Sequence, residues 1–190
     1  HKIAAIRTLL LSEPNIKSKL ISYLSIGSFI KVTSFKNGFA KININKNHNR
    51  LKLNKGYIPE QHLIETHELK LDWVKTAENF IGTPYKWGGK SSFGLDCSAL
   101  VQLSTLNTDH SLPRDTKDQI KYNEFIDIDL SMAERGDIIF WDGHVGIFIN
   151  KNFIIHANAF TMNVSVEDVS KVLLRENLRK YKCIKRFKNK

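Results

Sequence analysis

The chain has 190 residues, enough for one or two domains, and 42% of them are hydrophobic, enough to build a core. Its formal net charge is +10, and such a balance raises the affinity for polyanions. The lysines are scattered and no nucleic-acid-binding motif occurs, so we expect no nucleic-acid partner. No apolar stretch is long enough to cross a membrane, which argues against membrane insertion.

Residues 1–65 contain short apolar runs separated by Asn, Gly and Lys. The runs cover residues 28–33, 39–44 and 50–53. Within the second run, Ala40, Ile42 and Ile44 alternate with other residues and fall on one side of a strand. The pattern predicts a small antiparallel barrel for residues 1–65.

A linker at residues 65–71 leads into the second predicted domain, residues 71–190. Asp72 is suited to cap a helix that ends at Gly82 and Pro84. The predicted inner face of this helix carries Trp73, Ala77 and Phe80.

A cysteine follows a turn-rich loop in the stretch GTPYKWGGKSSFGLDCSAL, residues 82–100. Apolar residues at helical spacing predict a helix over residues 98–106, with Asp96 as its N-cap. Cys97 then lies in the first turn, where the helix dipole favours an anion and lowers the thiol pKa. Cys97 is therefore a candidate nucleophile. The alternative is a small buried hydrophobic residue, which is how free cysteines often act.

Three apolar runs beyond residue 137 predict an antiparallel sheet. The predicted strands are 138–141, 144–149 and 153–158. Asp142 and Gly143 are a strong signal for a turn between the first two strands. If residues 150–152 form the next loop, Gly146 lies opposite His156.

Two histidines on this predicted sheet can act together. His144 faces Asn158 and lies diagonal to His156, with roughly 7–8 Å between the backbones, a gap that two imidazoles bridge. His144 is the candidate base for Cys97, and either His156 or Asn158 orients it. The alternative is a pair of structural histidines with satisfied hydrogen bonds.

At these residues the chain resembles the NlpC-type cell-wall peptidases, a family with a papain-like fold. The resemblance rests on GTPYKWGG, LDCSALVQ, LPRDTKDQ, ERGDIIFW, HVGIFI and IIHA, in the family's order and at its approximate spacing across residues 71–183. It implies an α+β fold in which Cys97 is the nucleophile, His144 the base and His156 the third polar member. The family hydrolyses amide bonds in peptidoglycan peptides, commonly between D-glutamate, through its γ-carboxyl, and a diamino acid.

Residues around the candidate nucleophile also match the family's substrate pocket. In members that bind a free N-terminal L-alanine, such positions hold the amine and the γ-D-glutamyl carboxylate. The resemblance implies substrate-binding roles for Asp96, Ser98, Asp115 and Thr116. Those members usually have Ser at the position of Thr116. A structural role for Thr116 is also open, because it fits a capping box as N-cap with Gln119 at the third helical position.

Residues 1–65 resemble a bacterial SH3-like domain more loosely, through residues 11–32, 56–59 and 62–63. Such a domain precedes the peptidase in members that act on small wall fragments, and a barrel tyrosine lines the substrate cleft there. Tyr57 is the matching candidate, with packing at the domain interface as its alternative role. Glu13 could supply a further carboxylate for a substrate amine.

The second of the two cysteines, Cys183, has no disulfide partner once Cys97 is assigned to chemistry, and we expect it in the core. This cysteine use favours a reducing compartment and hence the cytoplasm, with the periplasm or secretion as alternatives if a leader preceded His1. Neither zinc-ligand spacing nor a phosphate loop occurs, so we expect no metal and no cofactor. Residues 169–180 fit either a short helix or a strand.

Taken together, the motifs predict a cysteine peptidase that cuts the bond between γ-D-glutamate and a diamino acid in murein peptides, especially peptides with a free N-terminal L-alanine. One alternative is another amidase or acyl transferase on the same scaffold. The other is a wall-binding module that has lost its activity, against which the intact Cys97, His144 and His156 argue.

Overall fold

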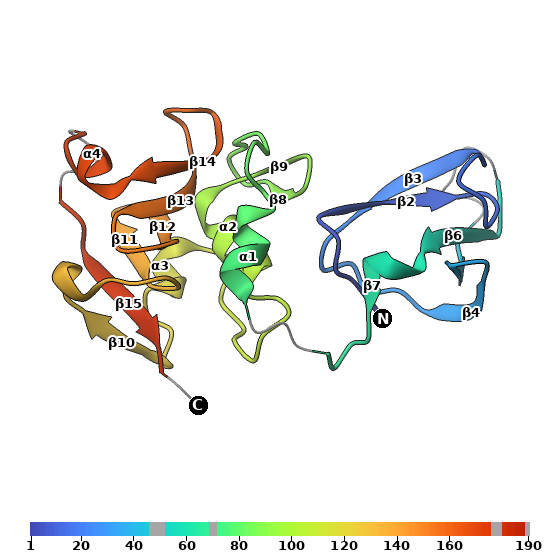
Figure 1. The fold of residues 1–190 in the computed structure, drawn as a ribbon, viewed down its shortest axis with the longest axis horizontal. Helices are drawn as coiled ribbons and strands as arrows, with labels where there is room; N and C mark the ends of the chain where they lie inside the picture. Colours follow the sequence, from blue (N-terminus) through green and yellow to red (C-terminus); the bar gives the residue numbers. More distant parts are fainter. Residues whose placement is uncertain (46–51, 69–71, 176–179, 189–190) are drawn as a thin grey trace. The chain divides into compact units, whose positions relative to one another are not determined.

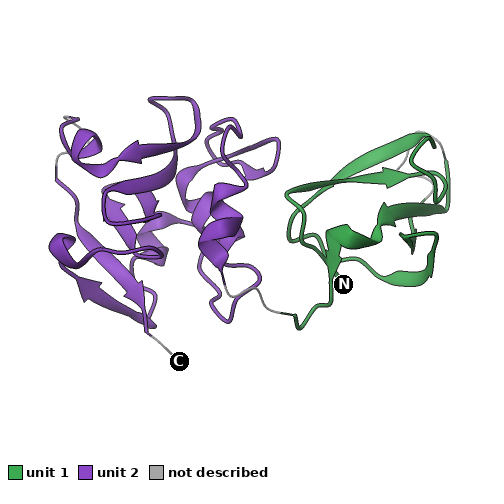
Figure 2. Cartoon of the chain, in the orientation of Figure 1, with its two compact units in different colours: residues 1–68 green, residues 69–190 purple. Residues whose placement is uncertain are grey.

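The structure is a computed structural model that describes residues 1–45, 52–68, 72–175 and 180–188. It divides into two compact units, His1–Glu68 and Leu69–Lys190, which Figure 2 colours separately. The domains expected from the sequence were residues 1–65 and 71–190. Parts of three predicted segments lie outside the described residues: 50–53, 65–71 and 169–180.

The first unit is built from antiparallel strands (Figure 1). Its main sheet has the order β3-β2-β6-β5-β4, and β1 pairs with β7 in a smaller sheet. The elements are β1 (Lys2–Ile3), β2 (Arg7–Leu11), β3 (Leu20–Ser25), β4 (Val32–Lys36), β5 (Phe39–Asn43), β6 (Lys55–Pro59), the 3-10 helix η2 (Glu60–His62) and β7 (Leu63–Ile64). The predicted run 39–44 matches β5, whereas run 28–33 reaches only the start of β4. An SH3-like barrel stays a prediction for this unit.

The turn between β4 and β5 has a clear local cause. Asn37 and Gly38 have φ angles of 51° and 75°, and two successive positive φ angles are typical of the type I′ hairpin turn. The turn sets the register in which Ala40 and Ile42 face the core, with Ile44 half-buried. A buried cluster of this core contains Ile3, Leu10, Ile42 and Ile58.

The second unit combines a six-stranded antiparallel sheet with short helices, which is the expected α+β class. The strand order is β10-β15-β11-β12-β13-β14. The helices are α1 (Trp73–Glu78), α2 (Cys97–Ser104), α3 (Thr116–Gln119), η3 (Leu130–Met132) and α4 (Val169–Leu173). The strands are β8 (Lys90–Ser91), β9 (Gly94–Leu95), β10 (Phe125–Ile128), β11 (Ile138–Trp141), β12 (His144–Phe148), β13 (Phe153–Asn158), β14 (Asn163–Asp168) and β15 (Cys183–Phe187).

The helices position the site by packing on the central strands. Helix α2 lies against β12 and β13, and α1 lies against α2 (Figure 1). Helix α4 packs through Val169 and Val172 on the sheet face that carries Ile139 and Trp141. All residues of β11 are buried, as expected for a continuous apolar run in a central strand.

The predicted helices occur with shifted ends. Asp72 caps α1 as predicted and accepts a hydrogen bond from the backbone of Lys75 at 3.0 Å. The helix ends at Glu78 rather than near Gly82, although its predicted inner face is buried. Helix α2 begins at Cys97 and ends at Ser104, compared with the predicted range 98–106. Helix α4 resolves the open choice in the segment 169–180 in favour of a helix at its start.

The prediction that Cys183 lies in the core is wrong. Cys183 is the first residue of β15, opposite Phe140, and this position at the strand end leaves it half-buried. Both cysteines carry free thiols. Within the described ranges, no helix has the length and apolar character needed to cross a membrane.

Candidate active site

Cys97 lies at the N-terminus of α2, as the sequence predicts. The carboxylate of Asp96 caps the helix by accepting a hydrogen bond from the backbone N–H of Ala99 at 2.9 Å. The Cys97 side chain is almost fully buried, and the backbone N–H of Val145 donates to its sulfur. Val145 directly follows His144, so helix packing brings the thiol to the strand that carries the candidate base.

The environment of the thiol opposes the expected effect of the helix terminus. Burial raises the pKa of Cys97, and the charge of Asp96 adds to this increase. Hydrogen bonds from Val145, Ser98 and Thr116 lower the pKa but do not outweigh burial. The expected lowering of the pKa by helix position alone is therefore wrong, and the thiol needs a base to take its proton.

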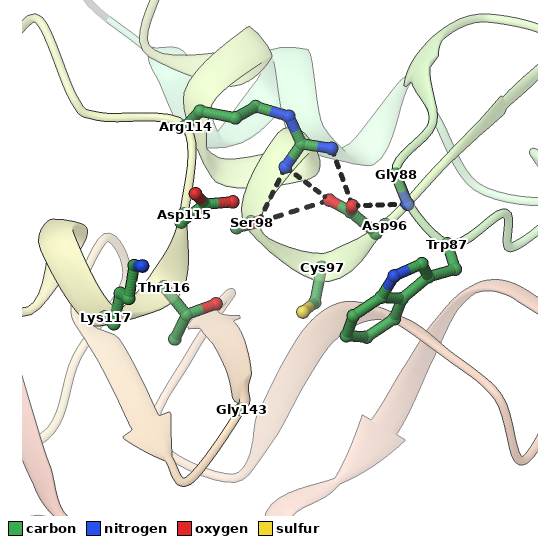
Figure 3. A pocket seen from close by; sticks show the side chains of 10 residues that line it. All are labelled: Trp87, Gly88, Asp96, Cys97, Ser98, Arg114, Asp115, Thr116, Lys117 and Gly143. Carbon is green, nitrogen blue, oxygen red and sulfur yellow. Dashed lines mark hydrogen bonds and ion pairs between the residues drawn. The ribbon is translucent and has the colours of Figure 1, made fainter.

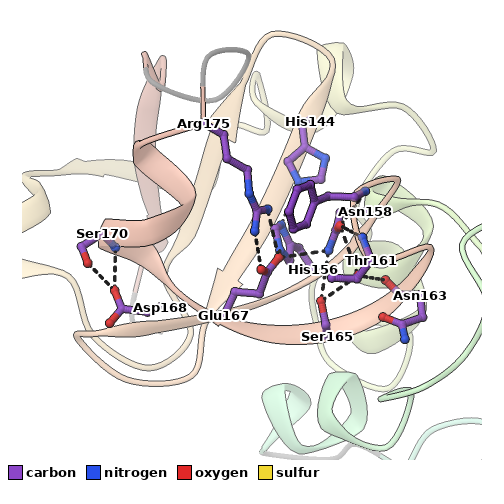
Figure 4. Close-up of polar contacts among 11 residues, drawn as sticks. His144, His156, Asn158, Thr161, Asn163, Ser165, Glu167, Asp168, Ser170 and Arg175 are labelled. Atoms are coloured by element: carbon purple, nitrogen blue, oxygen red, sulfur yellow. Dashed lines mark hydrogen bonds and ion pairs between the residues drawn. The ribbon is translucent and has the colours of Figure 1, made fainter.

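His144 and His156 form the predicted imidazole pair (Figure 4). Atom Nε2 of His144 lies 2.9 Å from Nδ1 of His156. The predicted register is confirmed where β12 and β13 pair, with Ile147 opposite Ile155. Gly146 lies opposite His156, and an added Cβ there would lie 3.2 Å from Cδ1 of Ile154 and 3.5 Å from Cβ of His156, so the tight contact would be with Ile154.

Of the two groups left open as the orienting partner, His156 is the one that contacts His144. His156 is fully buried and uses both ring nitrogens, Nδ1 toward His144 and Nε2 toward Glu167. The side-chain oxygen of Asn158 instead accepts from the backbone of Phe160 and Thr161 and so holds the turn that follows β13. Its amide nitrogen donates to Ser165 at 3.1 Å and to Glu167 at 3.4 Å, not to His144.

The pKa of His144 favours a neutral ring. Burial, then the neighbouring charges of His156 and Arg175, lower the pKa of His144 to about 3. Burial also lowers the pKa of His156. Both imidazoles are therefore neutral at physiological pH, and a neutral imidazole with a free lone pair can accept the thiol proton.

A cavity of about 480 Å³ opens beside Cys97 (Figure 3). It is lined by Trp87, Gly88, Asp96, Cys97, Ser98, Arg114, Asp115, Thr116, Lys117 and Gly143. Four of the predicted substrate-binding residues belong to this lining: Asp96, Ser98, Asp115 and Thr116. The other two candidates, Tyr57 and Glu13, belong to the first unit. The lining carries both signs of charge, because Arg114 and Lys117 accompany the two aspartates.

An ion pair organises one wall of this cavity (Figure 3). Arg114 donates to both carboxylate oxygens of Asp96, at 2.6 and 2.9 Å, and to the hydroxyl of Ser98 at 2.9 Å. The backbone N–H of Gly88 also donates to Asp96, at 3.0 Å. Asp96 thus holds Arg114 and Ser98 in place besides capping α2.

The capping-box interpretation of Thr116 is wrong. Thr116 is the first residue of α3, and Asp115 occupies the N-cap position without a capping hydrogen bond from its side chain. Gln119 turns inward and donates to the backbone carbonyls of Ser98 and Pro113, both at 2.9 Å. The Thr116 side chain faces the thiol and hydrogen-bonds to it (Figure 3).

A second cavity, of about 400 Å³, shares Gly143 with the first. It is lined by Tyr85, Asp142, Gly143, His144, Asn158, Ala159, Phe160 and Arg175. Tyr85 also lies close enough to the nucleophile to feel its charge. Burial, and then the charges of Cys97 and Asp96, raise the pKa of Tyr85. No pattern in the sequence marks Tyr85 as a site residue, although it belongs to the GTPYKWGG string.

Tyr57 belongs to the first unit. Its side chain is buried and packs with Leu11 and Phe39. The amino group of Lys55 lies 5.8 Å from the centre of its ring. The role of Tyr57 as a substrate ligand stays a prediction. Across the part of the chain that the structure describes, no group of three or more potential metal ligands occurs.

Two bacterial peptidases are similar to this chain over more than half of its length. The chain is 32% identical over 120 residues to "Dipeptidyl-peptidase 6" of Lysinibacillus sphaericus. The matched region covers 62% of this chain and 44% of that protein. It is 29% identical over 115 residues to "Gamma-D-glutamyl-L-lysine dipeptidyl-peptidase" of Bacillus subtilis (strain 168). This match covers 56% of this chain and 38% of that protein. The chain therefore spans less than half the length of these two relatives.

A solved structure supports the fold assignment. An NlpC/P60 family protein from Bacillus cereus matches 98% of this chain and 62% of its own with a TM-score of 0.77, at 20% sequence identity. A likeness at this identity concerns the fold alone. Residues 82–182, more than half of the chain, match the family model described as "NlpC/P60 family", and the chain therefore belongs to the NlpC/P60 family.

Proposed function

We propose that this chain is a cysteine peptidase that hydrolyses the amide bond between γ-D-glutamate and a diamino acid in murein peptides. The observation that carries the proposal is the hydrogen bond from the backbone of Val145 to the Cys97 thiol, because the preceding residue is His144, whose ring His156 holds. The name of the Bacillus subtilis relative, a γ-D-glutamyl-L-lysine dipeptidyl-peptidase, supports the choice of bond.

The proposed reaction uses the neutral imidazole as a base. Atom Nδ1 of His144 takes the proton of the Cys97 thiol as sulfur attacks the scissile carbonyl. The backbone N–H of Cys97, free at the start of α2, donates to the resulting oxyanion. The imidazolium then protonates the leaving amine of the diamino acid, and water, activated by the same ring, hydrolyses the acyl-enzyme.

The charges of the first cavity fit the acyl side of such a substrate. An L-alanyl-γ-D-glutamyl group carries one ammonium and one carboxylate. Asp96 and Arg114 pair with each other in the lining, and Asp115 and Lys117 add one further charge of each sign. A short peptide with a free N-terminus matches this mixed lining better than a neutral acyl chain, because each buried charge needs a partner.

Product analysis tests this proposal. L-Ala-γ-D-Glu-L-Lys and its meso-diaminopimelate counterpart are incubated with the protein, and the products are identified by mass spectrometry. Release of L-Ala-γ-D-Glu and of the free diamino acid is the expected result. Cleavage elsewhere, or transfer of the acyl group to an added amine without hydrolysis, would favour another amidase or an acyl transferase. The cytoplasmic location expected from the sequence is part of the proposal, and cell fractionation checks it.

A further inference from the structure

A carboxylate lies at the far end of the imidazole pair (Figure 4). Glu167, on β14, has Oε2 2.7 Å from Nε2 of His156. The register puts Glu167 opposite Ile154, two residues before His156, so both side chains lie on the same sheet face. His144, His156 and Glu167 thus form one continuous row of hydrogen bonds that crosses three neighbouring strands.

We propose that Glu167 is a positioning residue that fixes the tautomers of His156 and His144, so that His144 presents an unprotonated Nδ1 to the thiol. This inference rests on the proposed function of the same site. Glu167 reaches His144 through His156 and lines neither of the two cavities beside the nucleophile and the base.

The direction of the row follows from the chemistry of its end. An ionised carboxylate only accepts hydrogen bonds, so Glu167 requires a proton on Nε2 of His156. The neutral ring of His156 then has its lone pair on Nδ1, which accepts from Nε2–H of His144. The lone pair of His144 is left on Nδ1, the nitrogen that a base for Cys97 needs.

Without an acceptor at its end, the row can run in either direction. A group that donates to Nε2 of His156 puts the proton of that ring on Nδ1, which then donates to Nε2 of His144. The proton of His144 in turn moves to Nδ1, and the ring loses its capacity to take the thiol proton. Two buried neutral imidazoles do not favour either direction of hydrogen-bond donation by themselves. The carboxylate of Glu167 therefore determines the direction.

Arg175 keeps Glu167 in the form that can only accept. Its guanidinium pairs with both carboxylate oxygens of Glu167, and its contact with Oε2 measures 3.1 Å. It also stacks over the ring of Phe160 at 3.9 Å, which holds the guanidinium in place. Hydrogen bonds from Arg175 and His156 lower the pKa of Glu167 although burial alone would raise it.

Glu167→Gln tests the role of the carboxylate. The amide has almost the same size but can donate as well as accept, so it permits the reversed row. We expect kcat for murein peptide hydrolysis to fall at least roughly tenfold while KM changes less than about twofold, because the change acts through the base and not on bound substrate.

Glu134→Gln is the matched control. Glu134 pairs with Arg186 at 2.9 Å on an exposed part of the same unit. The control removes the same charge from a more exposed Arg–Glu ion pair and should keep the wild-type kcat. Unfolding midpoints of both variants separate a loss of folded protein from a loss of base function.

Two readouts do not depend on the substrate. Nitrogen NMR of the ring atoms should find Nδ1 of His144 unprotonated in the wild type and partly protonated in Glu167→Gln. Alkylation of Cys97 should slow in the same variant, measured in a Cys183→Ala background so that a single thiol reports. Unchanged ring tautomers and an unchanged alkylation rate in Glu167→Gln would overturn the inference. If the wild type leaves murein peptides intact, the proposed function fails, but these two readouts still decide the role of Glu167.

Arg175→Met tests whether Arg175 keeps Glu167 ionised. The titratable and charged groups that face Glu167 are Arg175, His156 and, one ring further, His144. The Asn158 amide also donates to Oε2 of Glu167 at 3.4 Å, whereas Asp168 points to Ser170. Loss of Arg175 raises the pKa of Glu167, so the acidic limb of kcat/KM should move to higher pH. Arg175→Lys retains the charge and should shift the limb less. An acidic limb that stays in place in Arg175→Met would overturn the role given to Arg175.

Discussion

At Cys97, position and burial act in opposite directions on the nucleophile. The helix start and three hydrogen bonds favour the thiolate, whereas burial and Asp96 favour the thiol, and the net effect is a raised pKa. A thiol in this state reacts only when a base accepts its proton. The nucleophile and His144 must therefore act as a unit, and the loss of either should remove most of the activity.

Cys97→Ala should reduce hydrolysis by at least about 1000-fold, because the residual rate then comes from binding alone. The fold should persist, since one sulfur atom is lost at the wall of a cavity. Steady-state kinetics and circular dichroism measure the two effects. Cys183→Ala is the control, because its half-buried thiol lies on β15, and it should keep nearly full activity. The opposite behaviour of the two variants would assign the nucleophile to Cys183.

His156→Ala should lower kcat more than Asn158→Ala. His156 holds the ring of the base at 2.9 Å, whereas the Asn158 oxygen serves the turn to Phe160 and Thr161. Asn158→Ala should mainly lower the unfolding midpoint, because the backbone groups of that turn lose their acceptor. Kinetics and thermal unfolding of both variants distinguish the cases. A far greater loss of kcat in Asn158→Ala would make Asn158 the orienting group.

The catalytic residues could be predicted because each depends on local signals. Cys97 follows from a cap and a helical pattern, and the histidine pair follows from one turn and the alternation of side chains. Glu167 could not be found in the same way, since its strand carries a mixed pattern and its pairing with β13 was not anticipated. The error at Thr116 has a related cause: its motif fits a capping box, but Gln119 bonds to distant carbonyls instead.

At the scale of elements, short-range pairing was predictable and long-range pairing was not. The turn residues Asp142 and Gly143 define the β11–β12 hairpin within a few residues. Strands β10 and β15 instead pair across about half the length of the second unit, with Phe125 opposite Phe187. Such contacts close long loops, and no local pattern specifies their register.

Helix α2 depends on Asp96 for more than its cap. In Asp96→Ala, the helix loses its N-cap and Arg114 loses its partner at the cavity wall. We expect a loss of about 2–3 kcal/mol in unfolding free energy, about 1 kcal/mol from the cap and the remainder from the unpaired guanidinium. Urea unfolding of the wild type and Asp96→Ala at neutral pH measures this loss in unfolding free energy.

Two variants separate these contributions. Asp168→Ala removes the N-cap of α4, where Asp168 accepts from the backbone of Ser170 at 2.8 Å, and should cost clearly less unfolding free energy than Asp96→Ala. Asp96→Asn keeps a good capping residue but removes the charge, so its cost should fall between the two alanine variants. Equal losses in Asp96→Ala and Asp168→Ala would contradict a structural role for the pair with Arg114.

At the scale of the whole molecule, the net charge and the first cavity favour different ligands. The chain carries a formal charge of +10, yet its first cavity contains two aspartates besides its cations. The overall charge attracts anionic material of many kinds. Discrimination between peptides must therefore come from local partners for the substrate's own charges, and the free N-terminal ammonium is the group that distinguishes a small peptide from intact wall.

N-acetylation of the L-alanine should lower kcat/KM at least about tenfold, equivalent to about 1.4 kcal/mol. The acetylated peptide lacks the ammonium, so the carboxylates of the cavity lose a partner that a desolvated site needs. Tyr57→Phe should lower kcat/KM for the free peptide and narrow the difference between the two peptides, because the variant lacks the hydroxyl proposed to bind the amine. Tyr23→Phe, on β3 of the same unit, is the control and should leave both values unchanged. Competition between free and acetylated peptides in one mixture gives the ratio directly. Equal turnover of both would rule out an amine pocket, and the protein would then be better understood as acting on intact, cross-linked wall.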